Sequence, residues 1–240
     1  MRFESALARG MLLRRYKRFL ADVALDGGPT VTAHCPNSGS MLGLTRPGLE
    51  VWLSRSRAPG RRLAYTLEMV GADGGLVGVN TGRPNALVAE AVAGGRIEGL
   101  RGYPSIRREV FVGAEPRTPG RRSRIDLVLE SAGRPACFVE VKNVHLRREA
   151  DLAEFPDSVT ARGAKHMDAL AALAADGLRA VVFYVVQRQD CGRFRVAADI
   201  DPAYAAALGR ARARGVEVLC YSCKLGHESI ELDSPLALEP

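Results

Sequence analysis

The chain has 240 residues, enough for one large domain or two small ones, and its 47% hydrophobic and 25% charged residues are typical of a globular protein. No stretch approaches the roughly 20 apolar residues that a membrane span requires, and the basic first residues lack the apolar run of a signal peptide. We therefore expect a cytoplasmic protein without membrane contact. The net charge of +7 makes nucleic acid a candidate partner, although an arginine excess also arises from codon usage.

Residues 12–79 contain short apolar runs separated by glycine and proline. Apolar and polar residues alternate over 13–25, and the glycines and proline of 27–29 then predict a turn. Further strands are predicted at 30–34, 50–54 and 65–70. Short strands at this spacing favour a small barrel over a helical unit. We therefore predict an oligonucleotide-binding (OB) type β-barrel, a nucleic-acid-binding domain, over residues 1–79.

From Asn80 onward, helical and strand patterns alternate. Helices are predicted at 85–93, 160–175 and 202–214. Strands are predicted at 105–112, 125–129, 137–144, 180–186 and 216–221. Proline, glycine and arginine in 115–122 indicate an exposed loop. This order predicts an α/β domain over residues 80–240, so the whole chain would be α+β with two domains.

Two consecutive predicted strands carry the strongest chemical signal. Glu140 and Lys142 are two residues apart on a strand, so their side chains point to the same face. Asp126 lies in the preceding apolar strand, and a hairpin would bring it beside Glu140. Two such carboxylates repel each other, and a divalent cation neutralises them; oxygen ligands suit Mg²⁺ or Mn²⁺. The alternative is a solvated ion pair between Glu140 and Lys142 on an edge strand.

The cysteines carry a weaker signal. Five cysteines in a chain without an export signal predict reduced thiols. Cys220 and Cys223 form a C-x-x-C with His227 nearby, which would be half of a zinc site. Because strand residues three apart point to opposite faces, the pattern disfavours zinc.

Asp126 followed by Glu140-Val141-Lys142, after a helix that bears Glu90, is similar to the PD-(D/E)XK nuclease superfamily, although Ile125 stands where that superfamily has proline. The whole chain resembles the sugar fermentation stimulation protein A family. This resemblance implies an OB-type barrel, a PD-(D/E)XK nuclease-like α/β domain and non-specific DNA binding. The name implies a link to sugar utilisation that these residues do not explain. The segments that carry the resemblance are 13–19, 33–41, 78–81, 105–110, 139–144, 155–160 and 162–166.

Carried over to this sequence, the resemblance makes Asp126, Glu140 and Lys142 the catalytic residues. Asp126 and Glu140 would bind Mg²⁺ or Mn²⁺, while Lys142 would stabilise charge on the phosphate and help position the attacking water. Glu90 is predicted as a further metal ligand, against the alternative of an exposed helix glutamate. Gln187, which ends a buried strand, is a candidate for binding water or substrate.

Basic side chains are predicted to bind nucleic acid in both domains. In the barrel, cations interleave with a ring, as in proteins that bind single strands; these residues are Arg14, Arg15, Tyr16, Lys17 and Arg18. In the α/β domain the candidates are Arg107, Arg108, Arg162 and Lys165, and one of the first two should face the groove. The alternatives are that the rings of Tyr16 and Phe19 lie in the barrel core and that the basic residues form ordinary solvated surfaces.

Three further polar positions have weaker interpretations. His166 shares a predicted helix face with Arg162 and Lys165, and is a weak candidate for a general base. Asp157 is interpreted as the cap of a turn or helix rather than as a metal ligand. The polar loop with His34, Asn37 and Ser38 is a candidate second binding surface without an assigned ligand.

We therefore predict a non-specific DNA-binding protein with divalent-metal-dependent phosphodiester hydrolysis. The rival hypothesis is a DNA-binding or regulatory protein, linked to sugar utilisation, that keeps the nuclease fold without significant turnover. The carboxylate pair favours the enzyme, because a binding domain has no need of costly repelling charges. The sequence leaves open DNA versus RNA, single strands versus duplex, and whether a homodimer forms.

Overall fold

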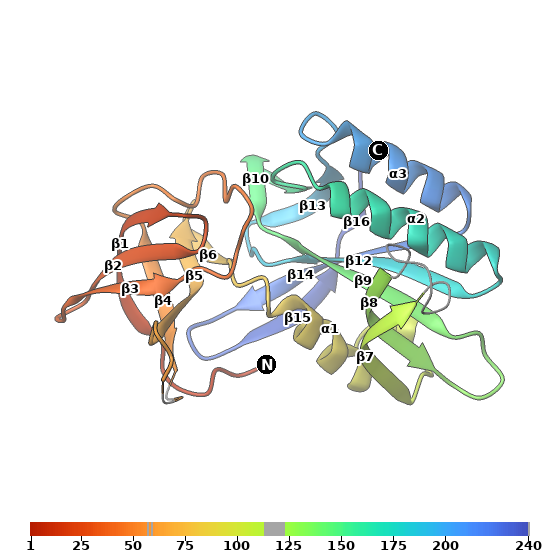
Figure 1. Ribbon diagram of the computed structural model, residues 1–240, viewed down its shortest axis with the longest axis horizontal. Helices are drawn as coiled ribbons and strands as arrows, with labels where there is room; N and C mark the ends of the chain where they lie inside the picture. Colours follow the sequence, from red (N-terminus) through yellow and green to blue (C-terminus); the bar gives the residue numbers. More distant parts are fainter. Residues whose placement is uncertain (57, 59, 113–122, 240) are drawn as a thin grey trace.

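Figure 1 shows the computed structural model, which describes residues 1–56, 58, 60–112 and 123–239. The N-terminal part is a barrel of short antiparallel strands whose order is β3-β2-β1-β4-β5-β6. A parallel pairing of β3 with β5 closes the first five strands into a ring. The predicted OB-type barrel is thus confirmed. Its strands are β1 (Ala8–Tyr16), β2 (Leu20–Leu25), β3 (Thr30–His34), β4 (Glu50–Arg55), β5 (Tyr65–Ala72) and β6 (Gly75–Gly78).

The alternating run over residues 13–25 is divided between two strands. Tyr16 and Leu20 pair at the end of a tight hairpin, and Lys17 and Arg18 adopt positive φ angles of 48° and 65°. The alternation continues on both sides of this turn, and no glycine or proline marks it, so the sequence pattern did not reveal the break. Neither Tyr16 nor Phe19 belongs to the described barrel core, and the Phe19 side chain is 48% exposed.

The rest of the chain builds an α/β domain around a six-stranded sheet with the order β15-β14-β12-β9-β8-β7. The parallel strands β9, β12 and β14 form its centre. The predicted α/β class is confirmed. The strands are β7 (Ser105–Val112), β8 (Ser123–Glu130), β9 (Cys137–Val144), β12 (Arg179–Val186), β14 (Glu217–Leu225) and β15 (Ile230–Pro235). The helices are α1 (Pro84–Ala93), α2 (Ala161–Ala175) and α3 (Pro202–Ala213), with a short 3₁₀ turn at Glu98–Leu100.

Helices cover both faces of this sheet (Figure 1). Alternate residues of a strand point to opposite faces, and β12 shows how this divides the core. Val181, Phe183 and Val185 pack with α1 on one face, while Val182 and Tyr184 pack with α2 and α3 on the other. The continuous apolar run of β12 therefore fits a central parallel strand that is buried on both sides.

A second, smaller sheet was not predicted. It consists of β10 (Leu146–Glu149), β11 (Asp151–Phe155), β13 (Cys191–Val196) and β16 (Ala237–Leu238), in that order. All four are short, and three of them are rich in charge: Arg148 of β10 and Arg195 of β13 both form ion pairs with the buried Glu154 of β11. A charged strand of this kind lacks the apolar alternation by which strands are recognised.

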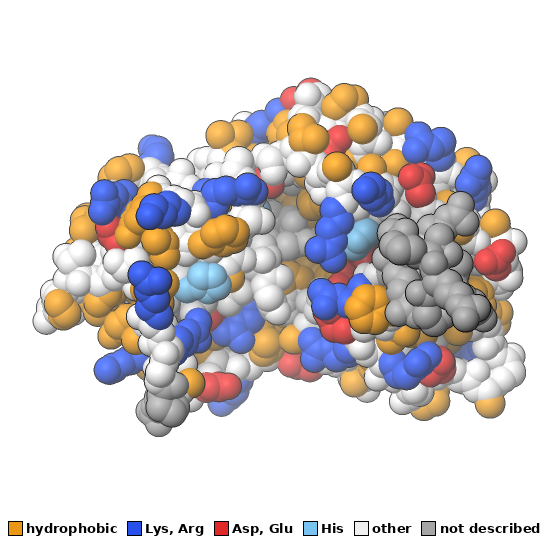
Figure 2. Space-filling view, viewed as in Figure 1, with side chains coloured by type: hydrophobic (Ala, Val, Ile, Leu, Met, Phe, Trp, Pro, Cys, Tyr) orange, Lys and Arg blue, Asp and Glu red, His pale blue; other side chains and the backbone are white. Residues whose placement is uncertain are grey.

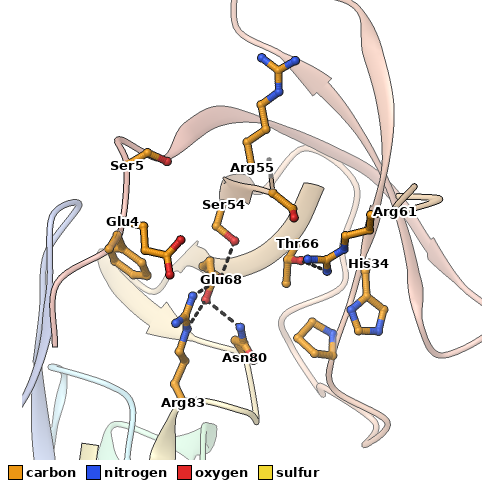
Figure 3. A pocket seen from close by; sticks show the side chains of 13 residues that line it. Glu4, Ser5, His34, Ser54, Arg55, Arg61, Thr66, Glu68, Asn80 and Arg83 are labelled. Atoms are coloured by element: carbon orange, nitrogen blue, oxygen red, sulfur yellow. Dashed lines mark hydrogen bonds and ion pairs between the residues drawn. The ribbon is translucent and has the colours of Figure 1, made fainter. Parts of the chain in front are cut away.

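A buried ion pair joins the barrel to the start of helix α1 (Figure 3). Glu68 of β5 is 1% exposed and accepts two hydrogen bonds from Arg83, the residue before α1, at 2.6 and 3.0 Å. Asn80 Nδ2 and Ser54 Oγ donate to the same carboxylate, at 2.8 and 2.6 Å. Every oxygen of Glu68 is therefore satisfied, and the network sets where α1 begins.

Other contacts also cross between the two parts. Asp157, which follows β11, accepts from Met41 N and from the Ser40 hydroxyl of the barrel. The N-terminal residues also cross to the α/β domain. Phe3 N donates to Glu228 O, so these residues pair with the turn before β15 rather than with the barrel. Asp157 thus caps a turn, as interpreted, but the turn belongs to the other domain. None of the helices in the described part of the chain has the length and apolar content of a membrane span.

Candidate active site

Asp126 and Glu140 lie on the adjacent strands β8 and β9, where the pairing of these strands ends. The ladder joins Leu127–Leu129 to Cys137–Val139 and stops there. Beyond that point Asp126 Oδ2 accepts a hydrogen bond from Val141 N at 2.8 Å. The Asp126 carboxylate therefore takes the place of a strand carbonyl as the acceptor for Val141 N. This hydrogen bond holds the carboxylate beside Glu140. The structure confirms that Asp126, Glu140 and Lys142 come together in one cavity.

The carboxylate of Glu140 is buried and only half satisfied. The residue is 2% exposed, and its Oε1 accepts from Lys142 Nζ at 2.7 Å and from His166 Nδ1. Its Oε2 is buried and finds no hydrogen-bond partner among the described residues. Buried carboxylate oxygens are rarely left without a donor or a cation. The environment of this oxygen therefore differs from that of an ordinary buried carboxylate.

His166 supports Glu140 from helix α2. Arg162 Nε donates to His166 Nε2 at 3.2 Å, so the imidazole carries its proton on Nδ1 and donates it to Glu140. The contact between Arg162 and His166 is consistent with their spacing of four residues on the helix. His166 is therefore placed to orient the carboxylate, and not to act as the general base that the sequence suggested weakly.

The two carboxylates have pKa values displaced in opposite directions. Burial, and then the charge of Glu140, raise the pKa of Asp126 above its usual range. Burial also acts to raise the pKa of Glu140, but the hydrogen bond from His166 and the charge of Lys142 outweigh it and hold that pKa below its usual range. Two close carboxylates in a partly dry cavity create a local excess of negative potential, which a cation would relieve.

Asn85 is a site residue that the sequence reading missed. It lies in the first turn of α1, and its Nδ2 donates to Asp126 Oδ1 at 2.8 Å. It therefore fixes the second oxygen of Asp126, and Glu68 indirectly helps by holding the start of α1 through Arg83. A clue was present in the sequence: an asparagine follows Pro84 at the start of a predicted helix, where a polar side chain can face a neighbouring strand.

Glu90 does not join this cluster. It accepts from the N-terminal ammonium of Met1 at 3.0 Å and from Arg96 at 3.1 Å, and its side chain is 48% exposed. Five residues along a helix correspond to a rotation of about 140° from Asn85, so Glu90 points elsewhere. The prediction of Glu90 as a metal ligand is therefore replaced by its alternative, an exposed helix glutamate.

The cavity around the carboxylates has a volume of about 230 Å³ and a polar lining. Its wall includes residues of α2, among them Arg162 and Gly163, and Thr81 from the connection between the domains. Figure 2 shows basic side chains gathered on both sides of the hollow between the barrel and the α/β domain. A cavity with two carboxylates at its floor and cations at its rim suits a phosphate that is bridged by a metal ion.

The other predicted nucleic-acid residues of the α/β domain lie farther out. Lys165 is exposed on α2, one turn from Arg162. Arg107 pairs with Glu130 at 2.8 Å, and Arg108 is also exposed. Neither Arg107 nor Arg108 belongs to the described lining of the site cavity, so the expectation that one of them faces the groove is not supported. The loop predicted over residues 115–122 lies outside the described residues.

The basic residues of the barrel have structural partners. Arg15 donates to the backbone carbonyls of Arg18, Asn37, Gly39 and Ser40, and so holds the loop of residues 37–40 in place.

The neighbouring residues also have partners within the barrel. Arg14 Nε donates to Asp22 at 2.8 Å, and the Tyr16 hydroxyl donates to the same carboxylate at 3.2 Å. Arg18 donates to Ser38 O, and Lys17 is exposed in the hairpin turn. Arg15 and Tyr16 are thus engaged within the fold.

Two minor candidates have structural roles. Cys220 and Cys223 are buried free thiols, and burial raises the pKa of Cys223 to about 12. The part of the chain that the structure describes holds no group of three His, Cys, Asp or Glu arranged to bind a metal, so the zinc alternative gains no support. Gln187 is fully buried between the domains and donates to Asn143 Oδ1 at 2.6 Å.

Comparison with known proteins agrees with this architecture. Residues 13–79 match the SfsA N-terminal OB domain, and residues 82–229 match the sugar fermentation stimulation protein RE domain. A sugar fermentation stimulation protein homolog from Rhodospirillum centenum is 58% identical over 238 residues, or 99% of both chains. One from Paramagnetospirillum magneticum is 55% identical over 239 residues, which cover 100% of this chain and 98% of that protein. The solved structure of Pyrococcus furiosus SfsA in complex with Ca²⁺ has a TM-score of 0.86 at 26% identity, covering 100% of this chain and 98% of that one.

An OB barrel followed by an α/β domain, with Asp126, Glu140 and Lys142 on adjacent strands of the second, defines a two-domain protein of the OB-plus-α/β class. The family matches cover both domains, and the relatives align over the full length. The chain belongs to the sugar fermentation stimulation protein family, as the resemblance implied.

Proposed function

We propose that this chain is a DNA-binding protein that hydrolyses phosphodiester bonds with the help of Mg²⁺ or Mn²⁺, without sequence preference. The observation that carries the proposal is the buried Glu140 Oε2 without a partner, beside an Asp126 carboxylate whose pKa is raised by burial and by Glu140. Strand pairing, a helix side chain and a backbone N–H all hold this costly arrangement in place. Such an arrangement is expected at a functional site and is hard to explain as a stabilising feature.

The donor set fits a hard divalent cation. Asp126 and Glu140 offer carboxylate oxygens, and Mg²⁺ usually takes one or two carboxylates and completes its shell with water and substrate phosphate. This also explains why a group of three protein ligands is lacking among the described residues. The Pyrococcus furiosus protein was solved in complex with Ca²⁺. We extend divalent-cation binding to this chain as part of the proposal.

When bound, the cation would supply a Lewis acid that withdraws charge from the scissile phosphate. The residues of the chain then have separate tasks. Lys142 Nζ lies 2.7 Å from Glu140 Oε1 and would move to the developing charge on a phosphate oxygen. Asn85 and Val141 N keep Asp126 in position, and His166 keeps Glu140 in position. Arg162 at the rim would bind the phosphate of the incoming strand.

A second function remains as the rival: DNA binding or regulation linked to sugar utilisation, without turnover. One observation favours it. Lys142 and His166 both hold Glu140 Oε1, which supplies part of the compensation that a metal would otherwise provide. The rival predicts affinity for DNA with an inert Asp126–Glu140 pair.

The test is a cleavage assay with labelled single-stranded, duplex and branched DNA of unrelated sequences, in Mn²⁺, in Mg²⁺ and in EDTA. The proposal expects metal-dependent products from wild type and none from Lys142→Ala, which should still bind metal. Removal of one preorganised donor to the transition state lowers turnover by about 100-fold or more. Salt-dependent DNA binding with no product on any substrate would establish the rival instead.

A further inference from the structure

A second polar cavity lies beside the candidate active site, at the junction of the two domains. It has a volume of about 340 Å³ and shares Thr81 and Thr160 with the site cavity, so the two are contiguous. We call it the junction cavity. The barrel contributes Arg18, Asn37 and Ser38 to its lining, and the α/β domain contributes Asn143, His145 and Ser158.

The lining of the junction cavity is rich in hydrogen-bond donors. Hydroxyls, amides, an imidazole and a guanidinium face it, and its single described carboxylate belongs to Asp157. That carboxylate already accepts from His145 Nε2 at 3.2 Å, from Met41 N at 2.9 Å and from the hydroxyls of Ser40 and Ser158, each at 3.3 Å. The negative charge in this lining is therefore already satisfied by groups of the chain itself.

Asn37 shows the imbalance most clearly. It is 2% exposed, and its Oδ1 accepts from Gly39 N at 2.9 Å. Its Nδ2 is buried and has no hydrogen-bond partner in the described part of the chain. A buried donor without an acceptor calls for an explanation, and an anionic ligand in the adjoining cavity would provide one.

Helix α2 begins between the two cavities. Thr160 caps it by accepting from Gly163 N at 3.0 Å, and the first turn carries Arg162 into the site cavity. The N-terminus of a 15-residue helix favours anions through its free N–H groups and its dipole. The orphan amide, the donor-rich lining and this helix end point to the same ligand chemistry, which is phosphate.

We propose that the junction cavity is a second phosphate subsite, which binds a backbone phosphate of the same strand whose neighbouring phosphodiester lies at Asp126 and Glu140. This inference rests on the proposed function, because it takes the site cavity as the place of cleavage. A strand bound in this way contacts the barrel through Arg18 and Ser38 and the α/β domain through Ser158. The barrel thus helps to present one nucleic-acid strand to the site.

The experiment measures binding of a labelled single-stranded oligonucleotide of about 8 nucleotides, a length typical for one OB fold, in EDTA so that nothing is cut. Ser38 is exposed and its side chain lines the junction cavity. We expect Ser38→Asp to weaken binding about tenfold at low salt, because a new negative charge would face the phosphate. Ser38→Asn, which has a similar shape and no charge, should stay within about threefold.

Three further variants test whether this result is specific to the cavity. Ser158→Asp and Ser158→Asn repeat the comparison from the α/β side and should give the same ratio. Ala132→Asp places the same charge in the exposed turn between β8 and β9, outside the described lining of both cavities, and should leave binding unchanged. Aspartate variants that bind like wild type would overturn the subsite, and so would equal losses from aspartate and asparagine.

Inorganic phosphate is added to the binding assay as a competitor and to a separate thermal melt, because a small phosphate could use the same donors. If inorganic phosphate protects wild type against thermal unfolding while the oligonucleotide does not bind, the cavity serves a small ligand and the strand proposal fails. Cleavage in Mn²⁺ is scored separately. Wild type that binds but never cuts would refute the proposed function and leave the binding ratios to decide the subsite.

Discussion

Glu68 and Glu140 are both almost fully buried glutamates, at 1% and 2% exposure, and their surroundings differ in kind. Glu68 joins the barrel to α1 and receives four hydrogen bonds that satisfy both of its oxygens. Glu140 shares one oxygen between Lys142 and His166 and leaves the other without a partner. The first arrangement is complete within the chain, whereas the second leaves one buried oxygen without a partner among the described residues.

The same contrast separates the basic residues. The guanidinium of Arg15 donates to four carbonyls of the barrel. Arg162, at the rim of the site, makes one described side-chain hydrogen bond, to the imidazole of His166. Residue type and burial alone do not distinguish structural charges from functional ones. For the two glutamates, how completely the carboxylate is partnered does distinguish them, and substitutions at the two glutamate regions can test this distinction.

The largest effect on stability is expected at Glu68. Glu68→Gln keeps the shape but removes the charge that balances Arg83, and loss of one partner of a buried pair costs about 3–5 kcal/mol. Arg83 is 29% exposed, so we expect the lower end of that range, about 3 kcal/mol. Urea unfolding measures it. Asp126→Asn is the matched control in the site, and without metal it should be neutral or slightly stabilising because it relieves repulsion. Equal losses in the free energy of unfolding from the two substitutions would contradict the distinction between the two carboxylates.

A smaller effect on stability is expected at Asp157, whose hydrogen bonds to Ser40 and Met41 form a clamp between the two domains. Burial acts to raise the pKa of Asp157, but hydrogen bonds from His145, Met41 N and Ser40 outweigh it and hold that pKa well below its usual range. A carboxyl with a depressed folded-state pKa stabilises the fold above its unfolded-state pKa, near 4, and this contribution is lost as the pH falls through the folded-state value.

Asp157→Asn should therefore cost about 1–3 kcal/mol at neutral pH, the range for hydrogen bonds to a charged group. The difference from wild type should shrink below about pH 4, where wild type begins to lose the same contribution. Thermal melts across this range, with Asp168→Asn as the exposed control, measure it. A difference that is constant with pH would show that the carboxylate charge of Asp157 is not the clamp.

The smallest effect distinguishes two neighbouring arginines. Arg15→Ala should destabilise the fold by about 1–2 kcal/mol, because four loop carbonyls lose their donor. Arg14→Ala should leave stability unchanged, since its side chain is 68% exposed and its ion pair with Asp22 is screened by solvent. Chemical unfolding of both variants measures this, and a loss of DNA affinity without a loss of stability in Arg15→Ala would restore its predicted binding role.

The sequence was most informative where patterns are local. Alternation predicted the barrel strands and the two β-strands of the site, because residues two apart on a strand share a face. The positions of Asp126, Glu140 and Lys142 followed from that rule together with one hairpin. The family resemblance added the roles expected of these residues. Local patterns failed for the charged strands of the small sheet, whose ion pairs form only after distant segments meet.

The parts of the site that the sequence did not predict depend on helix rotation and on contacts between segments that are distant in the sequence. Glu90 and Asn85 lie on the same helix, and sequence alone does not say which face meets β8. His166 and Glu140 are 26 residues apart, and Asp157 and Met41 are 116 apart. Such contacts are set by packing, so their residues looked like an ordinary helix histidine and a turn cap in the sequence.

The central claim is the proposal that Asp126 and Glu140 bind a divalent cation. Its most direct test is a thermal melt of wild type and Asp126→Asn with and without Mn²⁺. A ligand at about a hundred times its dissociation constant stabilises the folded state by about 2.7 kcal/mol. We expect that gain in wild type and its loss in Asp126→Asn, whose fold without metal should be intact. An equal gain in both proteins, or no gain in wild type at any Mn²⁺ concentration, would contradict the account.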